Sequence, residues 1–177
     1  MTHYEKFPQV DTDEAGGQVG AVYQDIQDTL RVPWVAFACR VLATFPGYLP
    51  RAWEAAGPSF STRYAERAAD ALRERALLPG PPPPDTHGRL RDAGWDEAAI
   101  DEVRRALDAL NYGNPKYLLL LTAWCEAFQD RPAGGGGTLS PEDAAALPRG
   151  LPEGVAPLHL VEPAGASSRV RTPRRVK

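Results

Sequence analysis

Cysteine, methionine and histidine are scarce in this 177-residue sequence, which contains two, one and three of them. Cys39 and Cys125 lie far apart and form no CxxC pair, so neither a disulfide framework nor a metal site is predicted. Without a disulfide framework, a reducing cytoplasm is the expected location. The three histidines are scattered, which predicts surface positions rather than ligands or bases: His3, His87 and His159.

An excess of basic charge is also missing, because 20 lysines and arginines face 23 aspartates and glutamates, for a net charge of −3. This balance excludes a general polyanion binder, so no nucleic-acid partner is expected. The longest nearly apolar run is Tyr117 to Cys125, far short of the ~20 residues that cross a bilayer, so no membrane span is predicted. The common phosphate-loop, dinucleotide, zinc-protease and serine-hydrolase motifs are absent.

Glycine and proline are abundant, with 16 and 18 residues. Changes in composition divide the chain into three predicted regions. Residues 1–18 are an acidic loose arm, residues 19–130 a helical domain, and residues 131–177 a Gly/Pro-rich and basic tail with the composition of a disordered segment.

Apolar residues recur at helical spacing from residue 19 onward, and no segment shows the alternation of a strand. The sequence therefore predicts an all-α, multi-helix domain of seven or eight helices. Gly57-Pro58 and Gly113 are interpreted as helix stops, and Ser140 as the start of a short further helix. The main expected helices cover residues 19–30, 34–45, 48–56, 59–78, 86–93, 96–112 and 115–129.

Two segments contain the candidate site residues: RVPWVAFACRVLATFPGYLPRAW (31–53) and NYGNPKYLLLLTAW (111–124). Trp34 and Phe37 are three apart on one expected helix and share a face. Asn114 and Tyr117 have the same spacing at an expected helix start. From composition alone the structural interpretation is favoured, with two core aromatics, an N-cap asparagine and a packed tyrosine ring.

Both segments closely resemble the group I 2-haloacid dehalogenases, the DehI-type enzymes, over about residues 7–160. The resemblance implies a fold related to the alkylhydroperoxidase-D-like helical fold. In the family two similar halves form a pseudo-dimer with the active site between them, and this chain resembles the N-terminal half. The implied reaction is hydrolysis of a small 2-haloalkanoic acid to a 2-hydroxy acid by direct attack of water, with inversion. No metal or organic cofactor is implied.

The resemblance also implies roles for the candidate residues. Trp34 and Phe37, with Ala36 beside them, would line the halide and substrate pocket, because indole N–H groups and ring edges suit a leaving halide. Asn114 would hold the attacking water, and Tyr117 would close the pocket.

The family's general base is an aspartate of the second half, which this chain does not reach. The expected Trp34–Phe37 helix cannot replace it, because no acid lies between Asp28 and Glu54. We therefore expect a truncated or frameshifted relative that is inactive alone, with a homodimer mate or a separate second-half chain as its partner. The alternatives are a non-catalytic helical remnant or binding module that dimerises through an exposed apolar half-interface, and a small-acid binder.

Overall fold

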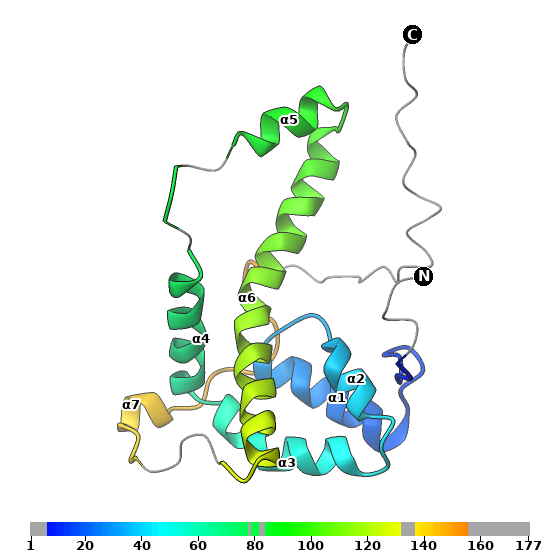
Figure 1. Cartoon of the computed structure of the whole chain (residues 1–177), viewed down its shortest axis with the longest axis vertical. Helices are drawn as coiled ribbons and strands as arrows, with labels where there is room; N and C mark the ends of the chain where they lie inside the picture. Colours follow the sequence, from blue (N-terminus) through cyan, green and yellow to red (C-terminus); the bar gives the residue numbers. More distant parts are fainter. Residues whose placement is uncertain (1–6, 78, 82–83, 132–136, 156–177) are drawn as a thin grey trace.

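The computed structural model describes residues 7–77, 79–81, 84–131 and 137–155. These residues form seven helices and no strand, which confirms the all-α prediction (Figure 1). Their one β-type contact is an isolated bridge between Thr62 and Ala146. The helices are α1 (Gly17–Leu30), α2 (Phe37–Leu42), α3 (Tyr48–Phe60), α4 (Arg63–Arg75), α5 (Thr86–Asp92), α6 (Glu97–Phe128) and α7 (Pro141–Ala144).

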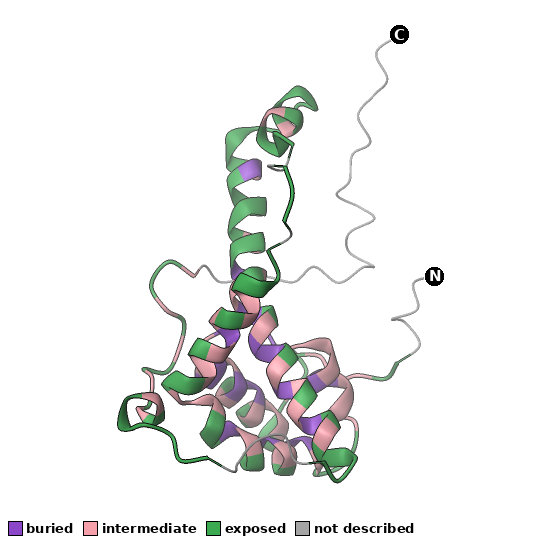
Figure 2. Ribbon diagram, turned by 60° about the vertical axis from the view of Figure 1, so that its left-hand side comes forward, coloured by how far each residue is buried: buried purple, intermediate pink, exposed green. Residues whose placement is uncertain are grey.

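The buried core lies where α1, α2 and α3 meet the C-terminal half of α6. Ile26, Leu30, Leu49 and Leu120 are almost fully buried there. The first half of α6 projects from this core together with α5 as a largely exposed arm (Figure 2). Within the described part of the chain, no helix is both long enough and apolar enough to cross a membrane.

Gly57-Pro58 does not end a helix, so the predicted boundary at residue 56 was wrong. Helix α3 continues through Pro58 to Phe60, and Gly57 is buried against the ring of Trp53. Ser59, the first residue of the helix predicted over residues 59–78, therefore lies inside α3. Thr62 caps α4 instead, with its hydroxyl accepting a hydrogen bond from the Ala65 N–H. Packing of the last turn of α3 against the core outweighs the local stop signal.

The predicted break at Gly113 is likewise absent, because α6 is one continuous helix with Pro115 inside it. Proline has no N–H, so it leaves the carbonyl of Asn111, four residues earlier, without its helical partner. Arg73 of α4 supplies a replacement, since its Nε donates to the Asn111 carbonyl over 3.2 Å. The described helices between residues 17 and 130 therefore number six, fewer than the seven or eight predicted.

Both flanking regions contact the helical body where they are described. The Val10 N–H donates to the Arg40 carbonyl, and the Tyr23 hydroxyl donates to the Val10 carbonyl. After α6, the Leu147 N–H donates to the Ser61 carbonyl. These parts of the predicted arm and tail are therefore held against the body, while the three-region division stays a prediction. The basic end of the predicted tail, residues 169–177, lies outside the described residues.

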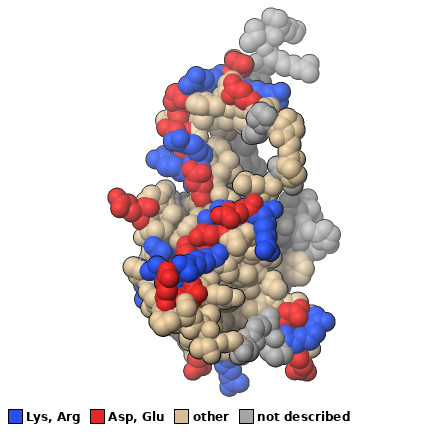
Figure 3. Space-filling model, turned by 90° about the vertical axis from the view of Figure 1, so that its left-hand side faces the viewer, with Lys and Arg blue, Asp and Glu red and all other residues tan. Residues whose placement is uncertain are grey.

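The charged face of α4 carries acidic and basic side chains in mixture, as Figure 3 shows. The sequence predicts such a solvated, paired face rather than a binding stripe. Its pairs reach mainly to another helix: Arg67 contacts Glu142 at 2.5 Å and Asp143 at 2.6 Å, both on α7. Exposed pairs of this kind are worth little individually, but they place α7 beside α4.

The two cysteines are expected to differ sharply in reactivity. Burial raises the pKa of the Cys39 thiol to about 12, whereas Cys125 is exposed. Since the thiolate is the reactive form, a chromogenic aryl disulfide at pH 8 should titrate one thiol per native chain and both after unfolding. Cys125→Ser should abolish the native reaction. Rapid reaction of both thiols in the native protein would contradict the buried position of Cys39.

Candidate active site

Trp34 and Tyr117 lie together in the core, although they come from distant parts of the chain. Their side chains are buried, and their ring centroids are 5.9 Å apart. The Tyr117 hydroxyl donates to the Trp34 carbonyl over 2.5 Å. Burial raises the pKa of Tyr117 well above its ordinary value, so the hydroxyl stays protonated and remains a donor at neutral pH.

Trp34 does not lie on a helix, so the predicted helix over residues 34–45 was wrong at its start. Helix α2 begins at Phe37, after Ala36 in an extended conformation. The Trp34 carbonyl accepts from Tyr117 of α6, and its ring packs against Gly113 of α6. These contacts with α6 draw Trp34 out of helical geometry, so it shares no helix face with Phe37.

Ala36 and Phe37 form the start of α2, beside the Trp34 backbone. Ala36 is the N-cap residue and packs partly buried against the core. Phe37 is also partly buried, and its ring contacts that of Phe7 edge-on, with centroids 6.4 Å apart. Trp34, Ala36, Phe37 and Tyr117 thus form one neighbourhood around the start of α2.

Asn114 is exposed on α6, next to Gly113, on which the Trp34 ring packs, and three residues before Tyr117. The expectation that it caps a helix was wrong, because α6 runs through it. Its side chain makes no hydrogen bond to another described residue, so its amide oxygen and its NH₂ group are both available to solvent. The next residues along α6 turn inward, and Tyr117 is buried.

The neighbourhood of Trp34 and Tyr117 is aromatic and weakly polar. Helix α2, which forms part of it, carries no acid. Within the described residues, no three His, Cys, Asp or Glu side chains are grouped so that they could hold a metal ion. The arrangement can surround an apolar or halogenated group, but no carboxylate of α2 could activate a water.

Arg40 is the residue near this neighbourhood that the sequence reasoning missed. It lies on α2, only 9% exposed, with its guanidinium carbon 5.9 Å from the Phe37 ring centroid. Asp11 forms an ion pair with it, with the Asp11 Oδ1 3.2 Å from Arg40 Nη1. An arginine within an otherwise apolar helix is a signal that could have identified it, because a buried charge needs a partner.

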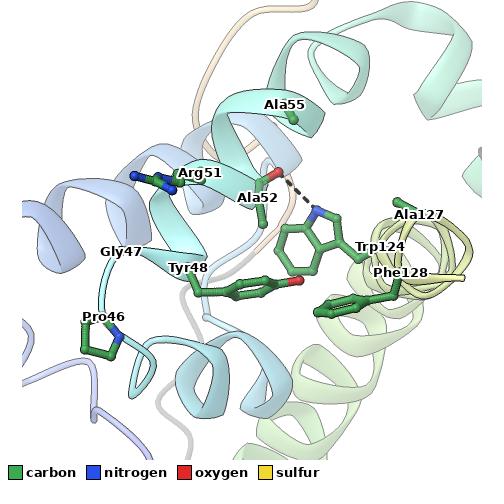
Figure 4. A pocket seen from close by; sticks show the side chains of 9 residues that line it. All are labelled: Pro46, Gly47, Tyr48, Arg51, Ala52, Ala55, Trp124, Ala127 and Phe128. Carbon is green, nitrogen blue, oxygen red and sulfur yellow. Dashed lines mark hydrogen bonds between the residues drawn. The ribbon is translucent and has the colours of Figure 1, made fainter. Parts of the chain in front are cut away.

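A separate pocket lies between α3 and α6, lined by none of the predicted site residues (Figure 4). It has a volume of about 490 Å³ and is walled by the rings of Tyr48, Trp124 and Phe128. Trp124 is fixed by a hydrogen bond from its indole N–H to the Ala52 carbonyl, 3.1 Å long. An apolar groove of about 640 Å³ adjoins it and extends between α3, α4 and α6.

The family model described as "Halocarboxylic acid dehydrogenase DehI" matches residues 33–169, which is most of the chain and includes all the candidate site residues. The chain belongs to the DehI family. The resemblance predicted from the two candidate segments is therefore confirmed.

Two similar proteins agree with this placement. The chain is 50% identical over 93% of its length to a configuration-inverting 2-haloacid dehalogenase of Pseudomonas sp. (strain 113), and covers 54% of that relative. It is 53% identical over 97% of its length to a protein of the same name from Alcaligenes xylosoxydans xylosoxydans, and covers 58% of it.

The fold is also found in a solved structure. A crystal structure of a D-2-haloacid dehalogenase mutant superposes with a TM-score of 0.69 and 27% sequence identity, covering 89% of this chain and 52% of that one. The chain thus spans about half the length of the relatives it matches.

Proposed function

We propose that this chain contributes to the hydrolysis of 2-haloalkanoic acids, in which water attacks the carbon that bears the halogen and a 2-hydroxy acid and halide are released with inversion. The observation that carries the proposal is the 50% identity over almost the whole chain to a relative named as a configuration-inverting 2-haloacid dehalogenase. The weakly polar neighbourhood of Trp34 and Tyr117 supports it.

In this proposal Trp34, Ala36 and Phe37 line the site for the substrate and the leaving halide, and Tyr117 closes it. Positive ring edges and N–H donors stabilise a leaving halide, whereas a negatively charged acceptor such as a carboxylate repels it. The Tyr117–Trp34 hydrogen bond holds the two walls of the site together. Direct attack by water needs no covalent intermediate, so these residues position the substrate and the leaving halide and do not react themselves.

Asn114 holds the attacking water in this proposal. Its exposed amide can bind a water without breaking a contact to a described residue. The general base comes from a separate second-half chain, because α2 brings no carboxylate in this chain or in a second copy of it. Loss of general base catalysis alone slows a reaction by about 10²–10⁴-fold.

Halide release from D- and L-2-chloropropionate tests the proposal. The chain alone should release little halide, and adding the remaining half of the Pseudomonas relative in trans should raise the rate. Asn114→Ala should then lower the rate by about 10²-fold through loss of water positioning. Asn111→Ala is the matched control, since it replaces another exposed asparagine of the same helix. Equal rates for both variants would exclude the role of Asn114, and no release under any condition would contradict dehalogenation.

The α3–α4–α6 groove is the surface on which we propose that the second-half chain docks, since this chain spans about half the length of its relatives. Exposed Tyr64 and Leu118 and the rings of Trp124 and Phe128 lie in or beside it. Such a patch favours association. Leu118→Glu should therefore lower the apparent mass that light scattering gives for the mixture with the remaining half of the Pseudomonas relative. Leu77→Glu, at an exposed leucine outside the groove, should not. A wild-type chain that forms no complex with that half would contradict this docking.

A further inference from the structure

The pocket between α3 and α6 is a cavity that the proposed function does not use. Its volume of about 490 Å³ is typical of small-molecule sites. The Tyr48 ring stacks on Phe128, with centroids 5.5 Å apart and an interplanar angle of 27°. The Trp124 ring is held by its hydrogen bond to the Ala52 carbonyl (Figure 4). These walls offer flat apolar surfaces on which the ring of a ligand can stack or pack edge-on.

Arg51 gives this apolar pocket a positive charge. Among the described residues that line the pocket, it alone is charged. Arg51 also lines a polar pocket between α1 and α3 together with Asp25 and Glu54, but it forms no ion pair with either carboxylate. Asp25 is paired with Arg149 instead, at 2.5 Å. The first turn of α3 contains no acid. No described acid therefore neutralises the guanidinium of Arg51.

The position of Arg51 on α3 allows its charge to reach the pocket. Tyr48 and Arg51 are three residues apart in the first turn of α3, so their side chains leave the same side of the helix. In Figure 4 the guanidinium points away from the aromatic walls. Because Arg51 is exposed, rotating its side chain over the pocket breaks no contact with a described residue. A carboxylate at the α3 edge of the pocket can then accept hydrogen bonds from it.

We propose that the α3–α6 pocket binds a small aromatic carboxylate, with its ring against Trp124 and Phe128 and its carboxylate on Arg51. An arginine donates parallel hydrogen bonds to a planar carboxylate, which gives an acid an advantage over an uncharged ring. Three aromatic rings can also form a cage for a quaternary ammonium ion. Arg51 would repel such a cation, and no acid is among the described residues that line the pocket. The site shares no residue with the one proposed for dehalogenation.

NMR titration of the 177-residue chain with benzoate, benzamide and benzyltrimethylammonium tests the charge of the ligand while the aromatic ring stays the same. This method suits the weak binding of such small ligands. The indole N–H resonance of Trp124 reports on the pocket itself. Benzoate should bind most tightly, benzamide more weakly, and the cation most weakly. The chain is used alone, because Trp124 and Ala127 line both this pocket and the groove proposed for the second half.

Two exposed positions test the charge and the apolar wall separately. Arg51→Met should weaken binding of benzoate about two- to fivefold, the worth of an exposed ion pair, and leave benzamide unchanged. Phe128→Ala should weaken both ligands alike, by about two- to tenfold, because each loses one aromatic contact. Phe128 is 69% exposed, so this variant leaves no buried cavity. The matched controls Arg104→Met and Phe7→Ala, at exposed residues outside the pocket, should change neither ligand.

The charge series and the variants can each overturn the proposal. Benzamide binding as tightly as benzoate, or a preference for the cation, would exclude a carboxylate site. Unchanged affinity of Arg51→Met for benzoate would exclude Arg51 as the group that receives the carboxylate. No shift of the Trp124 resonance with any of the three probes would exclude the site and leave the pocket as part of the surface for the second half.

Discussion

Glu66→Leu is expected to lower the free energy of unfolding by about 3–5 kcal/mol at pH 7, because it leaves a buried lysine without its counter-charge. Lys116 is only 4% exposed in its side chain, and its Nζ donates to Glu66 Oε2 over 2.8 Å. The same Nζ donates to the Leu30 carbonyl over 2.9 Å and lies 3.7 Å from the Tyr112 ring centroid. Chemical denaturation monitored by circular dichroism measures the loss.

The double variant Glu66→Leu/Lys116→Met is the control for this prediction. Replacing both charges with apolar groups of similar size is often close to neutral, so the double variant should recover most of the stability. Strict additivity of the two single losses would show that the ion pair is not the origin of the effect.

The same lysine should make stability depend on pH. Burial lowers the pKa of Lys116 from 10.5 to about 8, although the Glu66 carboxylate opposes this shift. Between pH 8 and 10.5 the unfolded chain then holds a proton that the folded chain has released, so the free energy of unfolding rises with pH by at most about 1.4 kcal/mol per unit. Relative to Lys116→Met, the wild type should therefore gain stability across this window. Other groups such as Cys39 titrate in both proteins and cancel in the comparison. A difference in free energy of unfolding between the wild type and Lys116→Met that stays constant between pH 8 and 10.5 would contradict the lowered pKa of Lys116.

Gly113→Ala should destabilise the protein by about 1–3 kcal/mol through overpacking. Alanine favours a helix by about 1 kcal/mol over glycine. A loss of stability would therefore indicate overpacking, and a gain would indicate helix propensity alone. A Cβ at Gly113 would lie 2.3 Å from Cη2 of Trp34 and 2.9 Å from Cγ1 of Val32. The Trp34 ring is rigid and buried, so it has little room to move. Thermal and denaturant unfolding measure the change.

A double-mutant cycle with Trp34→Leu checks the cause of that loss. In the Trp34→Leu background the ring is gone, so Gly113→Ala should cost much less. Asn114→Ala, at the next and exposed position of α6, should cost nothing or stabilise slightly, because alanine favours helices. An equal cost of Gly113→Ala in both backgrounds would show that the conflict with Trp34 is not its source.

The local signals for helix starts were reliable where no distant contact competed with them. Asp96, where the sequence predicts a helix to begin, caps α6, and its carboxylate accepts a hydrogen bond from the Ala99 N–H. Ser140 caps α7 in the same way. Both side chains bond to a backbone N–H three residues later, so the residue type and its immediate neighbours suffice to predict them.

The stop signals failed where another helix supplied what the local sequence lacks. Gly113-Asn114-Pro115 predicts a break, yet α6 continues because Arg73 of α4 satisfies the carbonyl that Pro115 leaves unpaired, and because Trp34 packs on Gly113. Arg73 and Asn111 are far apart in the sequence, and no periodicity within either segment indicates their contact. The wrong break also led to a wrong prediction for Asn114, which is an exposed residue within α6 and not a helix cap.

The sequence by itself determined the helical class, most helix positions, the family and the residue types of the candidate site, because periodicity, capping residues and long motifs are local properties of the chain. Only the tertiary structure decided that Trp34 lies outside α2, that Tyr117 bonds to its carbonyl, and that Asp11 pairs with Arg40. Each of these depends on segments that meet only after folding, when close packing and the pairing of buried polar groups select one arrangement among those that the local sequence permits.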